Sequence, residues 1–159
     1  MGKGEVNIRE AAEGDVAAMV GLWNEMMDFH QELDPIFPRT DKNNEAWIEF
    51  ITDHLSKEES CVLVAEQNGQ IVGHSLAFIS EFPPVISIKE YGIFQELAVT
   101  AGCRRSGIGK GLFNETLNWF RKHGIKHVEV QVSIFNELSM TFWRKMGFRP
   151  YLETLCMEI

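Results

Sequence analysis

The spacing of apolar residues divides the chain into the helices and strands of a single α+β unit. Val6 and Ile8 alternate with polar residues, which indicates a first short strand. Apolar residues then recur every three or four positions over 15–33 and over 42–56, which predicts two amphipathic helices. Two prolines, Pro35 and Pro38, end the first of these helices and begin a loop.

The second half of the chain alternates between short apolar runs and one long helical pattern. Asn68-Gly69 lies between two apolar runs and predicts a tight β-hairpin. Gly124 and Gly147 stand where glycine ends a helix. Strands are predicted at 61–67, 70–80, 88–99, 127–133 and 151–159. Helices are predicted at 107–123 and 138–146. The expected order is therefore β-α-α-β-β-β-α-β-α-β.

Length and composition indicate one soluble globular domain spanning residues 1–159. Hydrophobic residues make up 45% of the chain and charged residues 24%, a balance typical of folded proteins. No apolar run approaches the roughly 20 residues that span a bilayer, and the N-terminus lacks the apolar core of a secretory signal. The three cysteines form no disulfide framework or zinc spacing, and no HxxxH pair is present, so we predict a cytoplasmic protein without a metal.

The charge balance restricts the class of partner. The net charge is −8, from 23 acidic and 15 basic residues, and such a surface repels a polyphosphate backbone. Nucleic acid is therefore excluded as a partner, whereas a cationic small molecule or a basic peptide is favoured.

The most informative stretch joins the strand at 88–99 to the following helix. A helix start offers backbone N–H groups and the positive end of the helix dipole, which together bind an anion. Gly107 and Gly109 let the backbone approach a phosphate closely, and Arg104, Arg105 and Lys110 add positive charge. The residues therefore predict a pyrophosphate site.

Two other phosphate motifs do not fit this stretch. A Walker loop requires lysine where Ile108 stands. A dinucleotide fingerprint requires G-x-G-x-x-G at the first strand–helix turn, whereas Gly107, Gly109 and Gly111 have a different spacing and lie late in the chain.

Two motifs resemble those of the GNAT acyltransferase superfamily. Arg104-x-x-Gly107-x-Gly109 is similar to its [Q/R]-x-x-G-x-[G/A] coenzyme motif. Asn136, with Ser139 and the later Phe142-Trp143-x-Lys145-x-Gly147-Phe148, resembles its second signature. Both stand in the family's order and separation, and the resemblance covers the chain from residue 6 to residue 159.

The resemblance implies a mixed, mostly antiparallel sheet flanked by helices, whose two central parallel strands splay apart to admit the pantetheine arm of acetyl-CoA. It also implies a set of coenzyme-binding residues on the strand, the turn and the last helix. These are Leu97, Ala98, Val99, Arg104, Arg105, Ser106, Gly107, Ile108, Gly109, Lys110, Asn136, Phe142 and Lys145. The family also commonly forms homodimers.

The implied reaction is acetyl transfer from acetyl-CoA to a primary amine of a small molecule or peptide by direct attack. An amine is almost wholly protonated at pH 7, so a base must accept its proton. Glu96 is the candidate base, Gln95 a candidate for orienting the acceptor, and the N–H of Leu97 or Val99 a candidate oxyanion donor. The first helix and the loop over 34–43 roof the acceptor pocket in this family, where Asp28, Glu32 and Asp34 would meet a cation.

One departure from the family pattern leaves two interpretations open. Many relatives have a tyrosine where Trp143 stands, and an indole N–H does not protonate a leaving thiolate. Cys103, Tyr91 and solvent are the alternatives for a general acid. The competing interpretation is a non-catalytic acyl-CoA-binding or regulatory module of the same fold.

Overall fold

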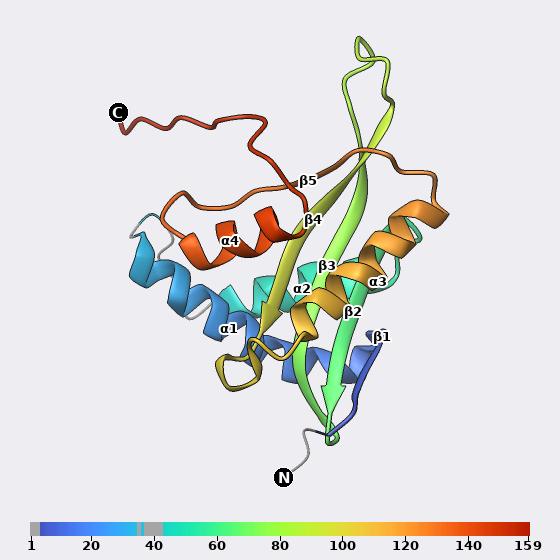
Figure 1. Cartoon of the computed structure of the whole chain (residues 1–159), viewed down its shortest axis with the longest axis vertical. Helices are drawn as coiled ribbons and strands as arrows, with labels where there is room; N and C mark the ends of the chain where they lie inside the picture. The colour runs from blue at the N-terminus through green and yellow to red at the C-terminus, as the bar shows by residue number, and fades with distance from the viewer. Residues whose placement is uncertain (1–3, 35, 37–42) are drawn as a thin grey trace.

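The strands of this computed structural model, which describes residues 4–34, 36 and 43–159, form one mixed sheet in the order β1-β2-β3-β4-β5 (Figure 1). The strands are β1 (Val6–Glu10), β2 (Ser60–Gln67), β3 (Gln70–Glu81), β4 (Glu90–Val99) and β5 (Val128–Val130). The α-helices are α1 (Val16–Leu33), α2 (Asn43–Leu55), α3 (Ile108–Lys122) and α4 (Glu137–Lys145). Neighbouring strands run antiparallel except for the parallel pair β4–β5. The predicted fold class is thus confirmed; position 42, the expected start of the second helix, lies outside the described residues.

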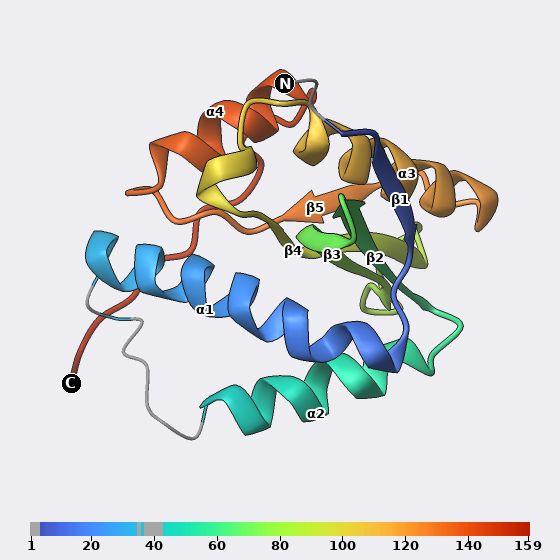
Figure 2. The ribbon, with the colours of Figure 1, turned by 90° about the horizontal axis from the view of Figure 1, so that it is seen from below.

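The helices cover the sheet in two layers. Helices α1 and α2 lie on one face, and α3 and α4 lie on the other (Figure 2). On the first face Met19 and Ile51 pack against the strand residues Val64 and Leu76. On the second face Phe120 is among the buried residues that pack around β4. The helical periodicity of the sequence therefore directs one apolar stripe of each helix to the sheet.

Strands β4 and β5 separate after three paired positions. Their ladder runs from Gly92↔Val128 to Phe94↔Val130. Next along β4, Gln95 is an extra residue, because Leu76 of β3 pairs with Glu96 and Ala77 pairs with Phe94. A bulge of this kind bends its strand and increases the local twist. The bend agrees with the splayed parallel pair that the resemblance implies.

The same divergence explains why β5 is shorter than the predicted strand over 127–133. Residues 131–133 still alternate between apolar and polar side chains, yet β4 has turned away and offers them no backbone to pair with. A strand is assigned only where its backbone forms hydrogen bonds with a neighbouring strand, so β5 ends at Val130.

The predicted turns are confirmed. Asn68 and Gly69 have φ angles of 54° and 75°, as a type I′ hairpin turn requires. Gly124 and Gly147, which follow α3 and α4, have φ angles of 74° and 100°.

The prediction of a final strand over 151–159 is wrong for the single chain. These residues form no helix or strand, and all of them are exposed. The segment extends from the body without joining the sheet (Figure 1). Alternating sequence alone does not make a strand, because the backbone also needs a neighbouring strand to bond with. Among the described residues, no helix is long and apolar enough to cross a membrane.

Candidate functional site

The turn between β4 and α3 forms a backbone concavity at a helix start. A short 3-10 helix, η2 (Ala101–Cys103), leads into the turn, where Arg105 and Gly107 have φ angles of 58° and 90°. Among the described residues, no side chain caps the N-terminus of α3. The first backbone N–H groups of α3, from Ile108 onward, therefore remain available to an anion.

Gly107 keeps this concavity open. A Cβ built on Gly107 would have no heavy atom within 4 Å, so the space in front of it is empty of protein. Its φ of 90° lies in the left-handed region, which a branched side chain adopts only with strain. The geometry therefore fits a phosphate group lying directly against the backbone.

Gly109 brings the two sequence motifs together. A Cβ built on Gly109 would lie 3.4 Å from Cε2 of Phe142 and 3.6 Å from Cδ2 of Leu97. The strand before the turn, the helix start and α4 thus meet at one point. The structure therefore places these three predicted coenzyme residues side by side.

The last part of β4 offers a free backbone edge beside this point. The N–H of Thr100 donates to the carbonyl of Val72 in β3 at 3.0 Å. Because successive N–H groups of a strand point to opposite sides, those of Val99 and Leu97 point away from β3. On that side β5 pairs with β4 only as far as Phe94. These two N–H groups consequently face the gap between the splayed strands.

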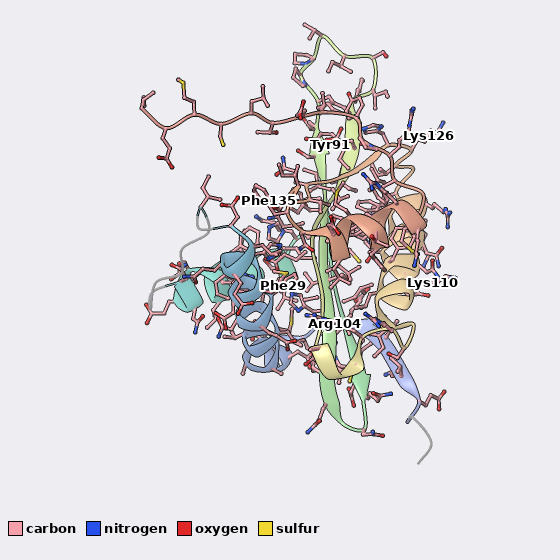
Figure 3. The ribbon with its side chains drawn as sticks, turned by 60° about the vertical axis from the view of Figure 1, so that its left-hand side comes forward. Phe29, Tyr91, Arg104, Lys110, Lys126 and Phe135 are labelled. Atoms are coloured by element: carbon pink, nitrogen blue, oxygen red, sulfur yellow. The ribbon has the colours of Figure 1, made fainter. Side chains whose placement is uncertain are left out.

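Arg104 and Glu25 tie the turn to helix α1. Glu25 accepts hydrogen bonds from the Thr100 hydroxyl at 2.9 Å and from the Ala101 N–H at 2.7 Å. Arg104 donates from Nε to the Val99 carbonyl at 2.9 Å, and its guanidinium lies 3.5 Å from Glu25 and 5.9 Å from the centre of the Phe29 ring. The Arg104 side chain therefore lies between the turn and α1, whereas Lys110 lies on α3 (Figure 3).

The other predicted coenzyme residues surround the turn in different ways. Asn136 is 5% exposed and caps α4, since its Oδ1 accepts from the Ser139 N–H at 3.0 Å. Ser106 donates from its hydroxyl to the Cys103 carbonyl within the turn. The side chains of Arg105, Lys110 and Lys145 are exposed, and Ala98 is buried. The positively charged side chains of Arg105, Lys110 and Lys145 can reach an anion at the mouth of the site, whereas Asn136 caps helix α4.

Glu96 lies at the edge of a cavity of about 280 Å³ between α1, α2 and β4. Its lining includes Trp23, Trp47 and Phe50 together with the Glu96 carboxylate. The two indole rings stack at a centroid distance of 5.5 Å. The cavity therefore combines aromatic residues with one acidic group, an environment suited to an organic cation.

Two ring N–H groups hold the Glu96 carboxylate. Trp47 donates from Nε1 to both carboxylate oxygens, at 3.0 and 3.3 Å, and Nε2 of His74 lies 3.2 Å from Oε2. An ionised carboxylate only accepts hydrogen bonds, so His74 carries its proton on Nε2. The Nδ1 atom of His74 is buried without a hydrogen-bond partner among the described residues. With both oxygens held, the Glu96 side chain is only 9% exposed.

The side chains considered as a general acid contact other parts of the structure. Tyr91 lies five residues earlier on β4, about 16 Å away at 3.3 Å per residue, and stacks on Phe82. Cys103 directs its Sγ toward Gln67 of the β2–β3 hairpin, at 3.8 Å. Trp143 is buried against Phe94 and donates to the Ser139 hydroxyl at 3.1 Å. Cys103 and Tyr91 are thus engaged elsewhere, and solvent is the remaining alternative for the general acid.

Sequence reasoning missed the side chains that organise the cavity. The sequence analysis does not assign Trp47 or His74 to the site, although His74 lies in the mostly apolar stretch of β3, where a buried polar residue is a recognisable signal. The acidic residues Asp28 and Glu32 on α1 are exposed and do not line the cavity. Asp34 accepts from the Ile36 N–H at 3.1 Å, and positions 35 and 37–42 of the predicted roof lie outside the described residues.

Comparison with known proteins shows the family. The model of the Acetyltransferase (GNAT) family matches residues 13–148. The chain therefore belongs to the GNAT family of acetyltransferases, as its two motifs indicate. Within the described residues, no group of three or more His, Cys, Asp or Glu side chains is arranged to hold a metal ion.

Several relatives carry acetyltransferase names. The chain is 26% identical over 145 residues to the "Uncharacterized N-acetyltransferase YhfO" of Bacillus subtilis, covering 90% of this chain and 89% of that protein. It is also 26% identical over 105 residues to an "N-alpha-acetyltransferase" of Sulfurisphaera tokodaii, covering 63% of each. These relatives support an acyltransferase activity in general.

Solved structures share the fold. A predicted acetyltransferase from Clostridium acetobutylicum, solved with acetyl-CoA, superposes with a TM-score of 0.80 at 20% identity over 97% of this chain and 96% of that chain. The aminoglycoside N-acetyltransferase AAC(6')-Iy, solved with CoA, superposes with a TM-score of 0.76 at 17% identity, covering 100% of this chain and 97% of that chain.

Proposed function

We propose that the protein transfers an acetyl group from acetyl-CoA to a primary amine of a small molecule or peptide by direct attack. The observation that carries the proposal is the position of Glu96. Its carboxylate lines the aromatic cavity, and the next residues of β4 offer the free backbone edge that leads to the phosphate turn. An acceptor in the cavity and a donor along the edge would therefore meet beside one base.

The donor side of the site fits acetyl-CoA. The open space at Gly107 and the uncapped start of α3 suit the pyrophosphate, and the exposed Arg105 and Lys110 add positive charge. The free N–H groups of Leu97 and Val99 suit the amide-rich pantetheine arm. In this proposal Arg104 and Asn136 act by holding the turn and α4 in place. The donor supplies a thioester carbonyl, the electrophile of the reaction.

The acceptor side fits an alkylammonium group. Aromatic rings line the cavity, Phe50 being the most exposed of them at 37%, and an aromatic face attracts a cation, to which the nearby carboxylate adds a full opposite charge. The chain as a whole has a net charge of −8, which favours approach of a cation. A neutral or anionic acceptor would gain none of these interactions.

Glu96 would accept a proton from the bound ammonium, directly or through one water. The resulting amine attacks the thioester carbonyl, and a backbone N–H of Leu97 or Val99 stabilises the developing oxyanion. The carbon–sulfur bond then breaks, the CoA thiolate leaves, and the nitrogen of the new amide loses its extra proton to solvent. Solvent protonates the thiolate in this scheme, because Trp143, Tyr91 and Cys103 point elsewhere.

An amine panel tests the proposal. The protein is mixed with acetyl-CoA and with alkylamines, polyamines, aminoglycosides or peptides with a free amino group, and the release of CoA thiol is followed. Matched alcohols serve as controls that lack the amine. We expect thiol release with at least one cationic amine and none with its alcohol. Tight acetyl-CoA binding without release across the panel would instead support a non-catalytic coenzyme-binding module.

A further inference from the structure

The cavity beside Glu96 is small, and one face of α2 forms one of its sides. The side chains of α2 that line it recur every three or four positions, at Asn43, Ala46, Trp47 and Phe50. Residues with this spacing lie in one row along a helix, and this row is about 10 Å long. The cavity volume of about 280 Å³ lies below the range of about 300–1,000 Å³ that is typical of sites for drug-sized ligands. The cavity therefore suits a compact acceptor.

The acidic end of the cavity lies inside, and its apolar end lies at the rim. The Glu96 side chain is only 9% exposed, and the buried Trp47 donates to its carboxylate. Phe50 is 37% exposed and Ala46 is exposed as well, so both lie where the cavity meets solvent. Phe50 follows Trp47 by three residues, which is about 4.5 Å along the helix. An acceptor whose ammonium group lies beside Glu96 would thus place its next few carbon atoms against Phe50.

The charge of the cavity matches one ammonium group. Of the described residues that line the cavity, Glu96 alone is charged. One ammonium group neutralises this carboxylate, so a second ammonium group in the cavity would gain no net attraction. It would nevertheless lose its hydration, and an unpaired charge is costly in an apolar environment. The cavity therefore disfavours an acceptor that carries several positive charges.

The rim of the cavity matches an apolar body. An apolar chain or ring that covers Phe50 removes apolar surface from water, and an aromatic ring also gains a contact between two rings. A hydroxyl-rich body would lose its water at the same place. Among the described side chains that line the cavity, only Asn43 and Glu96 offer it hydrogen bonds in return. The rim therefore favours a hydrocarbon body over a sugar.

We infer that the acceptor is a compact monoamine with an apolar body, an arylalkylamine or a short alkylamine, and that polyamines and aminoglycosides are poor acceptors. The inference rests on the proposed function, because it places the reacting amine beside Glu96. The net charge of −8 attracts monoamines and polyamines alike, so the selection between them arises in the cavity. Glu96 binds the ammonium end, and Phe50 contacts the apolar body.

A matched pair of acceptors tests the selection by charge. Pentylamine and cadaverine have the same carbon chain, and cadaverine carries a second amine. With saturating acetyl-CoA, kcat/KM from thiol release is expected to be at least about tenfold higher for pentylamine. Phenethylamine is expected to match or exceed pentylamine, and kanamycin to be the slowest of the four. Equal or better use of cadaverine or kanamycin would overturn the inference and leave acetyl transfer itself intact.

Two variants of α2 test whether the cavity makes this selection. Ala46→Asp places a second carboxylate at the rim and is expected to bring kcat/KM for cadaverine close to that for pentylamine. Ile48→Asp adds the same charge to the same helix, but Ile48 is exposed and does not line the cavity. This control is expected to keep the wild-type ratio. Equal effects of the two aspartates would show that the overall field of the protein selects the acceptor, and the inference would be wrong.

The aromatic rim is tested separately. Phe50→Ala is expected to raise KM for phenethylamine about tenfold, because the ring of the acceptor loses its apolar contact. The KM for acetyl-CoA is expected to stay at the wild-type value, since Phe50 lies on the acceptor side. An unchanged KM for phenethylamine would refute the contact between Phe50 and the body of the acceptor.

Binding measured without turnover separates this inference from the proposed reaction. Trp23 and Trp47 line the cavity, so tryptophan fluorescence reports its occupancy when the full chain is titrated with each amine in the presence of CoA. Pentylamine and phenethylamine are expected to bind more tightly than cadaverine. If this order holds and no amine releases thiol, the proposed reaction is wrong and the class of ligand stands. No response to pentylamine or phenethylamine would overturn the inference.

Discussion

Replacement of Glu96 by glutamine removes the proposed base with little change of shape. At pH 7 only about one in a thousand molecules of an alkylamine is unprotonated. Loss of a positioned base is expected to reduce kcat by about 10²–10⁴-fold at neutral pH. The loss should shrink as the pH approaches 10, because the acceptor then carries its own unprotonated amine. The binding of acetyl-CoA should hardly change, since backbone groups of the same strand form the donor side.

The hydrogen bonds around Glu96 also predict how much folding stability the Glu96→Gln substitution costs. The carboxylate accepts from Trp47 and His74 with its two oxygens, whereas glutamine offers one oxygen and one NH₂ group. When the glutamine oxygen takes the Oε2 position it still accepts from both rings, but its NH₂ group then faces the Trp47 N–H at the Oε1 position, where two donors meet. One unsatisfied buried group costs about 1–3 kcal/mol. The melting temperature of Glu96→Gln should therefore fall by about 2–4 °C for each kcal/mol in a chain of this size.

The assay is a pH profile of kcat by thiol release, with acetyl-CoA affinity measured by calorimetry and melting by scanning calorimetry. Glu90→Gln is the matched control, because Glu90 is exposed at the start of the same strand. We expect this control to retain wild-type turnover and melting. Full activity of Glu96→Gln from pH 6 to pH 10 would refute the role of Glu96 as the base.

Three further changes probe other parts of the structure. Gly107→Val should abolish acetyl-CoA binding by calorimetry, because a branched side chain would occupy the phosphate space, while Gly102→Val, where φ is not positive, should retain most of it. Glu25→Gln should weaken acetyl-CoA binding several-fold by loosening the β4–α3 turn, and unchanged affinity would argue against this link to α1. Burial raises the pKa of Cys61 to about 12, so alkylation at pH 8 followed by mass spectrometry should modify the exposed Cys156 and leave Cys61 intact until unfolding. Near pH 9 the Cys61 thiol loses its proton only in the unfolded state. The free energy of unfolding should therefore fall by up to about 1.4 kcal/mol per pH unit above pH 9, and Cys61→Val should remove this contribution to the pH dependence.

The backbone geometry of the proposed donor side was predictable because it depends on local sequence. A strand, a glycine-bearing turn and a helix start are consecutive in the chain, and each has its own signal. The structure accordingly shows the helix beginning at Ile108 after a left-handed Gly107. The side-chain direction of Arg104 was not predictable, since it depends on Glu25 and Phe29 of a helix far away in the sequence.

The acceptor side depends on residues that meet only in the folded chain. Trp47 comes from α2, His74 from β3 and Glu96 from β4, and no spacing in the sequence relates them. Sequence periodicity assigns Trp47 to a helix and His74 to a strand interior, but it does not show that both donate to one carboxylate. Distant contacts of this kind decide what the Glu96 side chain can do, and they become visible only with the structure.

The short length of β5 has its physical origin in the neighbouring strand. After the bulge at Gln95, β4 turns away from the direction of β5, and the sheet loses a continuous neighbour at that edge. The residues after Val130 then lack a partner on the β4 side. The same turn of β4 opens the gap that exposes the N–H groups of Leu97 and Val99. The geometry that would admit the coenzyme thus also leaves β5 as a short edge strand.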